Sequence, residues 1–374
     1  MRRRSLGLPA LLSTGAAGLL LVAACSSSSG SSSSGGTSSH PATSAAGKAA
    51  TVAFLMPCST CAARFEHQDQ PDFIADVHAL DPGAKVIADN AQGSDATQIS
   101  QAEDALTNGA TVLVVSPLDQ TTGEAIAAKA KAAHATVISY DGLLTGAQVS
   151  FYVSFDPVVV GTMQGQYLVS HLAKGSTVVM INGDQTAETG REFKQGALNA
   201  LQPAFRSGQL ELGYSADTTQ FDPSKAQAEM AAALTRLHNN VQGVLVANDG
   251  MAAGVIAELK AQHLAGRVLV TGQDATDAGL GYILEGIQSM TVYKSIRQEA
   301  ETAAKVAVGL VAGNAGIVQS VATSNVSNGA GQIPSVLLSP QVITKPNVSL
   351  AVSDGAATWS AICAGIPAGD CPGH

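Results

Sequence analysis

The sequence predicts an α/β protein with two lobes, each built on a largely parallel sheet. Short apolar runs alternate with longer segments of helical periodicity that are rich in Ala, Gln, Glu and Lys, which is typical of β-α-β units. The same alternation starts again after Asp156-Pro157. Residues 51–374 are also too many for one ordinary compact core and suit two domains. We therefore expect two similar α/β lobes.

The apolar runs give the expected strands, and the segments between them give the helices. The first lobe is expected to have strands at 52–56, 85–88, 112–115 and 137–140. A typical helix is expected over 95–108, with Ser94 and Asp95 as N-capping candidates and Gly109 in the C-cap position. The second lobe is expected to have strands at 177–181, 210–214, 243–247 and 268–271.

The N-terminus predicts export and attachment to a lipid. Three arginines at positions 2–4 precede an apolar stretch over residues 6–24, which is the organisation of a secretory signal. Two alanines directly before Cys25 resemble a bacterial lipobox, in which the cysteine thiol receives a diacylglycerol. An ordinary signal with a chance cysteine, or an uncleaved anchor, is the alternative, but Ser, Thr, Gly and Pro interrupt the stretch and make it poor membrane-spanning material. We expect a signal peptide over 1–25 and a lipidated Cys25 at the outer face of the cytoplasmic membrane.

A serine-rich segment follows the predicted lipidation site. Residues 26–50 consist mainly of Ser, Gly, Thr and Ala and cannot pack a core. A flexible coil of this length would let a domain move roughly 25–30 Å from the membrane. We interpret the segment as a disordered tether between a lipid and the folded lobes.

The charge distribution argues against a nucleic-acid partner. The formal net charge is −9, the sequence pI is about 5.3, and no Lys/Arg cluster follows the signal. A nucleic-acid surface needs a concentrated positive patch. We therefore expect no nucleic-acid partner, and we expect a monomer.

Four cysteines remain after lipidation. Cys363 and Cys371 lie in the last twelve residues of an exported protein and are expected to form a disulfide that ties down the C-terminus. Cys58 and Cys61 form a Cys-x-x-Cys, which is either a redox site or a small structural bridge. We favour the bridge, because no histidine or second cysteine pair with metal-ligand spacing lies nearby and the pattern is not thioredoxin-like.

Polar residues collect directly after the expected strands. In open parallel sheets, ligands bind beyond the carboxyl ends of the strands. A sugar hydroxyl both donates and accepts, so Asp, Asn, Arg and Lys together suit it, while an aromatic ring covers the apolar face of a sugar. Aromatic residues make up only 4% of the chain. The segments to consider are 57–65, 116–119, 141–142, 182–188, 248–249, 273–274 and Lys294, with Phe65 and Phe221 as the aromatic candidates.

Each of these residues also has a simpler interpretation. Asp249 and Asp274 fit as helix N-caps, and Lys294 fits as a solvated surface lysine. Arg64 fits as a surface ion-pair partner, and the two phenylalanines fit as ordinary core residues. What favours a ligand site is the position that these residues share at the strand ends.

Several sequence strings carry a family resemblance, in order at 97–101, 108–109, 112–117, 139–141, 151–156, 248–249, 264–268, 272–275 and 290–294. Together they resemble the periplasmic sugar-binding proteins of ABC importers, of the D-xylose-binding type. The resemblance covers almost all of residues 51–347. It implies two Rossmann-like lobes with parallel sheets, joined by a three-stranded hinge, that close over a sugar, which is the type I periplasmic binding protein fold.

The resemblance also implies lobe boundaries and a set of ligand-binding residues. It implies a first lobe of 51–153 plus 294–334 and a second lobe of 154–293 plus 335–374. Position by position, the residues implied to contact the sugar are Arg64, Phe65, Asp141, Phe221, Asn248, Asp274 and Lys294. The partners implied are a sugar and the permease subunits of an importer.

Three departures from the family pattern make xylose itself doubtful. Gly142 stands where the family has an arginine, which removes a forked cationic donor and leaves room. Glu188-Thr189 stands where the family has paired asparagines, so Glu188 offers an acceptor in place of amide donors. The first loop carries Cys58 and Cys61 in place of an acidic run. A site that loses a buried hydrogen-bond partner typically loses about 1–3 kcal/mol for the original ligand.

The sequence argues against an enzyme. It contains no nucleophile elbow, zinc-protease motif, phosphate-binding loop or dinucleotide fingerprint, so we expect no catalytic residue, cofactor or metal. A hydrolase with two carboxylates remains a minor alternative. A sugar-responsive repressor shares the fold, but it carries an N-terminal DNA-binding module where this chain has the predicted signal. A sensor that presents its ligand to a membrane receptor stays open.

Overall fold

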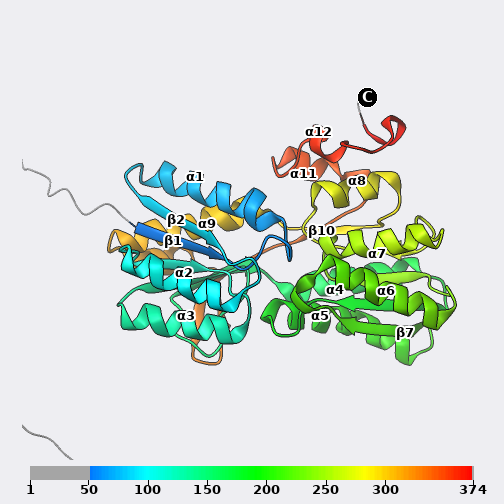
Figure 1. The fold of residues 1–374 in the computed structure, drawn as a ribbon, viewed down its shortest axis with the longest axis horizontal. Helices are drawn as coiled ribbons and strands as arrows, with labels where there is room; N and C mark the ends of the chain where they lie inside the picture. Colours follow the sequence, from blue (N-terminus) through cyan, green and yellow to red (C-terminus); the bar gives the residue numbers. More distant parts are fainter. Residues whose placement is uncertain (1–50, 373–374) are drawn as a thin grey trace, which may run out of the picture. The chain divides into compact units, whose positions relative to one another are not determined.

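The computed structural model describes residues 51–372 (Figure 1). The predicted signal peptide, Cys25 and the predicted tether over 26–50 lie outside these residues. Among the helices of the described part, none combines the length and the apolar character needed to cross a bilayer.

The first lobe is built on a seven-stranded sheet in the order β11-β12-β5-β4-β3-β1-β2. All neighbouring strands are parallel except the β11–β12 pair. The strands are β1 (Thr51–Met56), β2 (Lys85–Asn90), β3 (Val112–Val115), β4 (Thr136–Tyr140), β5 (Phe151–Phe155), β11 (Ser324–Ser327) and β12 (Gln332–Leu338). The helices are η1 (Phe65–Asp69), α1 (Gln70–Leu80), α2 (Asp95–Thr107), α3 (Gln120–Ala132), α9 (Ile296–Val311) and α10 (Gly316–Val321).

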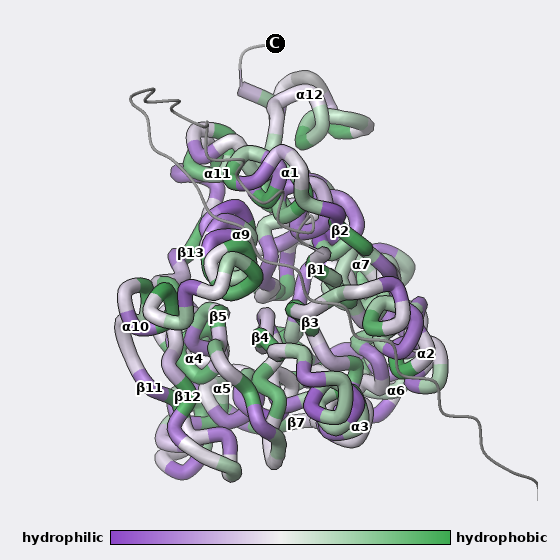
Figure 2. Tube along the Cα trace, turned by 90° about the vertical axis from the view of Figure 1, so that its left-hand side faces the viewer, coloured by the Kyte–Doolittle hydropathy of each residue, from purple (hydrophilic) through white to green (hydrophobic). Residues whose placement is uncertain are grey.

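Two layers of helices cover the first sheet. In Figure 1, α1 and α9 lie over one face, and α2 and α3 lie over the other. Alternate residues of β1 enter the two cores, because successive side chains of a strand point to opposite faces. Val52 and Phe54 belong to the core under α1 and α9, whereas Ala53 and Leu55 belong to the other core. In Figure 2, α9 carries both hydrophobic and hydrophilic residues, as expected for a helix with one buried face.

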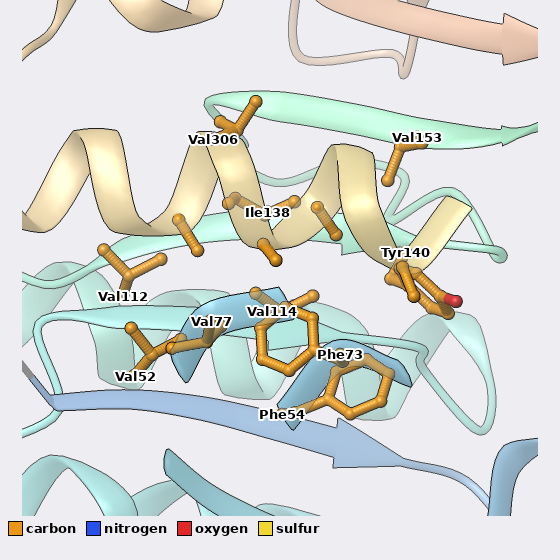
Figure 3. Close-up of a cluster of buried hydrophobic side chains, with 14 of the residues drawn as sticks. Val52, Phe54, Phe73, Val77, Val112, Val114, Ile138, Tyr140, Val153 and Val306 are labelled. Carbon is orange, nitrogen blue, oxygen red and sulfur yellow. The ribbon is translucent and has the colours of Figure 1, made fainter. Parts of the chain in front are cut away.

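The core under α1 and α9 extends to the end of the sheet at which the polar residues gather. Figure 3 shows its aromatic and branched side chains pointing toward one another, with Tyr140 at one end of the cluster. Phe54 stacks on Phe73 with ring centroids 4.5 Å apart and meets Tyr140 edge to face at 5.0 Å. Apolar burial of this kind stabilises by about 25 cal/mol per Å². The core therefore holds Tyr140 firmly where the strand ends.

The second lobe is built on a four-stranded parallel sheet in the order β7-β6-β8-β9. Its strands are β6 (Ser176–Asn182), β7 (Leu210–Asp217), β8 (Gly243–Val246) and β9 (Leu269–Val270). Its helices are α4 (Pro157–His171), α5 (Glu188–Arg206), η2 (Thr219–Phe221), α6 (Pro223–Leu237), α7 (Asp249–Ala261) and α8 (Asp277–Glu285). Helices α4 and α5 approach closely through glycines, since a Cβ on Gly161 would lie only 1.9 Å from the carbonyl oxygen of Phe193.

Three segments of the chain connect the two sheets. They follow β5, β10 (Thr291–Tyr293) and β12, and β10 pairs antiparallel with β13 (Gln341–Ile343). This agrees with the three-stranded hinge that the family resemblance implies. Strands β5 and β12 run to Phe155 and Leu338 within the first sheet. The lobe boundaries expected at 153/154, 293/294 and 334/335 stay predictions.

The C-terminal segment packs against α8. It contains η3 (Lys345–Asn347), α11 (Ser349–Ser353), α12 (Trp359–Ile362) and η4 (Ala368–Asp370). Val348, Ala351 and Ile362 join Leu280 and Ile283 of α8 in one apolar cluster. The structure contains a disulfide within this segment, between Cys363 and Cys371.

The predicted elements are present, with small shifts of their ends. The helix predicted over 95–108 is α2, and the Ser94 side chain accepts a hydrogen bond from Thr97 N, as an N-cap does. The strand predicted at 268–271 is only Leu269–Val270. The fold is thus the predicted α/β arrangement of two mostly parallel sheets.

Candidate functional site

A cleft opens where the carboxyl ends of the strands of both sheets meet. It contains about 620 Å³ of space not occupied by atoms, including the solvent at its mouth, which is in the usual range of roughly 300–1,000 Å³ for ligand pockets. Its walls come from the loops after β1, β3 and β4 of the first lobe and after β6, β7, β8 and β9 of the second. This is the position expected for a ligand site in open parallel sheets.

Arg64 is the centre of a buried charge cluster in the first lobe. Its side chain is almost fully buried and contacts three carboxylates. The Arg64 Nη2 atom lies 3.0 Å from Asp69 Oδ1, 3.2 Å from Asp141 Oδ1 and 3.3 Å from Glu299 Oε2. The Nε atom also donates to Asp69 Oδ2 at 3.1 Å. Burial alone would lower the pKa of Arg64, but these carboxylates, Asp141 first, raise it well above its ordinary value.

The hydrophobic core holds this cluster in place. The Tyr140 hydroxyl, at the end of the core cluster of Figure 3, donates to Asp69 Oδ1 at 2.5 Å. Glu299 comes from α9, on the other side of the same core. Burial raises the pKa of both Asp69 and Glu299, while Arg64 acts in the opposite direction. Two of the three carboxylates that hold Arg64, those of Asp69 and Glu299, therefore do not line the cleft.

Lys294 joins the charged groups of the two lobes. Its Nζ lies 3.0 Å from Asp274 Oδ1 of the second lobe and 3.7 Å from Asp141 Oδ1 of the first. Burial alone would raise the pKa of Asp141, but Arg64 and Lys294 lower it below its ordinary value. Asp141 is therefore ionised at neutral pH and can accept hydrogen bonds.

Asp249 supports the loop that carries Asp274. The buried carboxylate of Asp249 accepts from Gln288 Nε2 at 2.7 Å, from Thr291 Oγ1 at 2.9 Å and from Thr276 N at 2.9 Å. A Cβ on Gly272 would lie 2.1 Å from its Oδ1 atom, so the loop needs a glycine there. Burial, assisted by Asp274, raises the pKa of Asp249 to about 7.

The residue that caps the N-terminus of α7 is Asn248 and not the neighbouring Asp249. The sequence left an N-cap as the alternative for Asp249, but the N-cap of α7 is Asn248, whose Oδ1 accepts from Met251 N at 2.9 Å. The Nδ2 atom of Asn248 donates to the carbonyl oxygen of Cys61 in the first lobe at 2.9 Å. Asn248 lines the cleft and at the same time links the two lobes.

Three polar atoms of buried cleft residues have no hydrogen-bond partner. They are a donor, Arg64 Nη1, and two acceptors, Gln273 Oε1 and Asp274 Oδ1, of which Asp274 Oδ1 does form the ion pair with Lys294 Nζ at 3.0 Å. The Arg64 Nη1 and Asp274 Oδ1 atoms lie 4.0 Å apart. Both can reach one oxygen between them at ordinary hydrogen-bond distances of about 2.8 Å. Buried polar groups are normally paired, so this arrangement suits a ligand that donates and accepts through the same atom.

Two phenylalanines from opposite lobes line the cleft. Phe65 is buried and lies under the guanidinium of Arg64, with the Arg64 Cζ atom 5.0 Å from the ring centroid. Phe221 has a left-handed backbone, with φ of 52°. Its ring lies against Gly183, where an added Cβ would be 2.1 Å from Phe221 Cε1. The preceding residue, Gln220, also has a positive φ, so the whole turn is strained.

The cleft brings together the predicted ligand-binding residues except Glu188. Arg64, Phe65, Asp141, Phe221, Asn248, Asp274 and Lys294 all line it. Glu188 does not, because its carboxylate pairs with Arg191 one turn further along α5. Its neighbours Ala187 and Thr189 line the cleft instead. That any of these residues contacts a sugar stays a prediction.

Sequence reasoning did not single out several residues of the cleft. Asp184 and Gln273 follow β6 and β9 within segments that the sequence marked, so their place after a strand was the available signal. Phe193 and Gln220 lie further along the chain and gave no such signal. Among residues 51–372, no group of three or more His, Cys, Asp or Glu side chains has an arrangement that would hold a metal ion.

Comparisons with known proteins agree with this geometry. The sequence family described as the periplasmic binding protein domain matches residues 64–315. The D-xylose-binding periplasmic protein of Escherichia coli (strain K12) is 34% identical over 289 residues, which are 77% of this chain and 86% of that protein. The multiple sugar-binding periplasmic protein SbpA of Azospirillum brasilense is 30% identical over 283 residues, covering 71% of this chain and 78% of that protein. The crystal structure of a carbohydrate transporter solute binding protein from Chloroflexus aurantiacus, in complex with D-glucose, has a TM-score of 0.76 and 28% identity, covering 84% of this chain and 98% of that one.

Proposed function

The chain belongs to the periplasmic binding protein domain family, and we propose that it binds a monosaccharide or a related polyhydroxylated molecule in the cleft between its lobes. Membership of this family makes the chain a binding protein and not an enzyme, in agreement with the sequence-based expectation. The relatives named above are sugar-binding proteins, and we extend that property to this cleft.

The Arg64 Nη1 atom, which has no hydrogen-bond partner, and the Asp274 Oδ1 atom, whose partner is Lys294 Nζ, carry this proposal. They lie 4.0 Å apart in a buried part of the cleft, one a donor and the other an acceptor. A sugar hydroxyl accepts from the first and donates to the second, and Asp141 accepts from a neighbouring hydroxyl. Phe65 and Phe221 then cover the apolar faces of the ring. A purely apolar ligand would leave the buried Arg64 Nη1 atom without a partner, which costs about 1–3 kcal/mol.

Ligand binding in this proposal favours the closed arrangement of the lobes. Arg64, Phe65 and Asp141 belong to the first lobe, whereas Phe221, Asn248 and Asp274 belong to the second. A sugar that contacts both sets gains all its contacts only when the lobes are close together. It therefore shifts the population toward the closed form by its differential affinity for that form. The three connecting segments act as the hinge.

The identity of the sugar is set by the departures from the D-xylose-binding pattern. Gly142 supplies no cationic donor, and an added Cβ there would lie 3.3 Å from Pro117 Cδ. Because Glu188 pairs with Arg191, it supplies no acceptor to the cleft. We therefore propose a monosaccharide that relies on Arg64, Asp141 and Asp274 for its polar contacts, with xylose as one member of the panel to test.

We also propose that the protein is a lipoprotein, attached through Cys25, that delivers its ligand to the permease of an ABC importer. The signal-like N-terminus and the family support this proposal. Cys25→Ala should release the full chain from the membrane fraction of the producing cells. Retention of this variant in the membrane fraction would argue against a lipid anchor. Pull-down of the ligand-bound protein from solubilised membranes would distinguish a permease from a sensory receptor.

The binding proposal is tested by thermal unfolding of the full-length protein against pentoses, hexoses, polyols and short oligosaccharides. A ligand that binds only the folded state raises the free energy of unfolding, by about 2.7 kcal/mol at a ligand concentration of a hundred times its Kd. The unfolding temperature rises with it. At least one monosaccharide should give a concentration-dependent shift. If no member of the panel shifts the midpoint, the proposal fails.

A further inference from the structure

We infer that the disulfide-bonded loop from Cys58 to Cys61 is the first lobe's side of a contact that holds the two lobes together and raises the affinity for the ligand. We call this contact between the lobes the clasp. The clasp deepens the proposed function and rests on it, since it describes how the same cleft closes. The loop also carries the Cys-x-x-Cys of the sequence, which the binding proposal does not use. The structure contains the disulfide between these two cysteines.

The loop is fixed to its own lobe on both sides. Cys58 and Cys61 are buried in the core cluster that contains Phe54 and Phe65. Between them, the Ser59 hydroxyl donates to Glu66 Oε2 at 2.5 Å and accepts from the side-chain amide of Asn90 at 3.1 Å. The covalent bond closes a short ring between these anchors. The backbone carbonyl groups of the loop therefore have little freedom to turn.

One carbonyl of this loop contacts the second lobe directly. The oxygen of Cys61 accepts from Asn248 Nδ2 at 2.9 Å. Asn248 is itself held as the N-cap of α7, through its other side-chain atom. Both partners are buried, so the hydrogen bond forms away from bulk water, where an unpaired partner is costly. It joins a rigid carbonyl to a rigid amide across the cleft.

The beginning of the loop supports a second link between the lobes. The carbonyl oxygen of Pro57 accepts from Gly93 N at 2.9 Å. The carbonyl oxygen of Gly93 accepts from Gln220 Nε2 of the second lobe at 2.8 Å. Gln220 belongs to the strained turn that also presents Phe221, and Phe221 packs against the core clusters of both lobes. The Cys58–Cys61 loop, together with Pro57 before it, thus supports two hydrogen bonds and one apolar contact between the lobes.

The disulfide should matter because it orders this loop before the lobes close. Without the covalent bond, residues 58–61 would sample more backbone conformations in the open form, and closure would have to restrict them. Fixing the backbone of even one residue changes an equilibrium by roughly five- to thirtyfold. We therefore expect loss of the bond to weaken ligand binding by about fivefold or more.

The chain supplies a matched control for the test. Full-length Cys58→Ala/Cys61→Ala, the 58/61 variant, is compared with Cys363→Ala/Cys371→Ala, the control. The control removes the disulfide of the C-terminal segment, whose cysteines do not line the cleft. Small-angle X-ray scattering is measured first without any sugar. The radius of gyration should be larger for the 58/61 variant than for the parent and the control, because the lobes separate more. An unchanged radius in a folded 58/61 variant overturns the clasp, even if no sugar is found to bind.

Calorimetry then measures the affinity for a sugar that raises the unfolding temperature of the parent protein. It should fall about fivefold or more in the 58/61 variant and stay within twofold in the control. A parent that binds while the 58/61 variant binds equally well overturns the clasp and leaves the binding proposal intact. A parent that binds no sugar overturns the binding proposal, while the scattering result still decides the clasp.

A measurement on the unmodified chain covers the case in which the 58/61 variant does not fold. A phosphine reductant converts the disulfide to two thiols and is itself oxidised, and the thiols are then alkylated and located by mass spectrometry. Saturating sugar should slow the reduction of Cys58–Cys61 at least tenfold, because the contact with Asn248 in the closed form opposes the loop opening that exposes this buried disulfide. Reduction of Cys363–Cys371 should be unaffected. If sugar protects the two disulfides equally against reduction, or protects neither of them, the result would contradict the clasp.

Discussion

The two halves of the cleft hold their polar groups by different means. The first lobe fixes Arg64 with a cluster of buried carboxylates that is supported by the Tyr140 hydroxyl. The second lobe presents Asp274 and Phe221 on loops with positive φ angles of 92° and 52°. The first half is positioned by charge, and the second by backbone strain and hydrogen bonds in addition to the ion pair between Asp274 and Lys294. We therefore expect changes in the first half to damage the fold and changes in the second to damage mainly binding.

Removal of Arg64 should have the largest effect. Arg64→Ala leaves Asp69, Asp141 and Glu299 without their common cation, and breaking a buried ion pair typically costs about 3–5 kcal/mol. The free energy of unfolding, measured by urea denaturation, should fall by about that amount, and ligand binding should be lost. Arg267→Ala, at an exposed position, should change stability by less than about 0.5 kcal/mol. Equal stability of the two variants would show that charge does not hold the first half together.

Asp274→Asn should abolish binding and leave most of the fold intact. The side chain keeps its size but loses the charge that pairs with Lys294 at 3.0 Å and turns one acceptor into a donor beside Arg64. Sugar-induced thermal stabilisation should disappear, while the unfolding temperature without sugar should change by only a few degrees. Asp277→Asn, three residues further along the chain and exposed, serves as the control and should bind like the parent. Retained sugar stabilisation in Asp274→Asn would mean that the cleft is misassigned.

Asp249 should make the stability of the second half depend on pH. Its pKa is about 7 in the folded protein and near 4 when unfolded, so between these values the folded state binds the extra proton. Stability should therefore fall as the pH rises from 5 to 7, by up to about 1.4 kcal/mol per unit for this group. Above about pH 8, where Asp249 is ionised in both states, its contribution should be constant.

The test compares urea denaturation at pH 5, 6, 7 and 8 for two variants. Glu192→Gln removes another carboxyl whose pKa burial raises to about 7, and Glu192→Gln/Asp249→Asn removes both. The free energy of unfolding of the double variant should depend less steeply on pH than that of Glu192→Gln. A residual slope is expected, since burial also raises the pKa of Asp69 and Glu299 in the first half. Identical slopes would mean that Asp249 does not change its protonation on folding.

The comparison of the two halves also explains how much the sequence could predict. The strands and the gathering of polar residues after them follow from local patterns, so the sheets and most of the cleft could be predicted. The contact between Arg64 and Glu299 could not, because the two residues lie 235 positions apart in the chain. The left-handed turn at Gln220 and Phe221 depends on contacts with Gly93 and Gly183, which no local pattern encodes.

Glu188 shows how far the role of a residue can be predicted from its aligned position in a family. We expect its substitution to have the smallest effect on sugar binding. It begins α5 in the second half, and its carboxylate pairs with Arg191 on the outside of the cleft lining. Ion pairs that remain partly accessible to solvent contribute about 0–1 kcal/mol. Glu188→Ala should therefore leave the sugar Kd, measured by calorimetry, unchanged within twofold. Thr189→Ala, at the adjacent position that does line the cleft, should weaken binding more. A large loss in Glu188→Ala with none in Thr189→Ala would show that the carboxylate turns into the cleft when sugar binds, as the aligned position suggests.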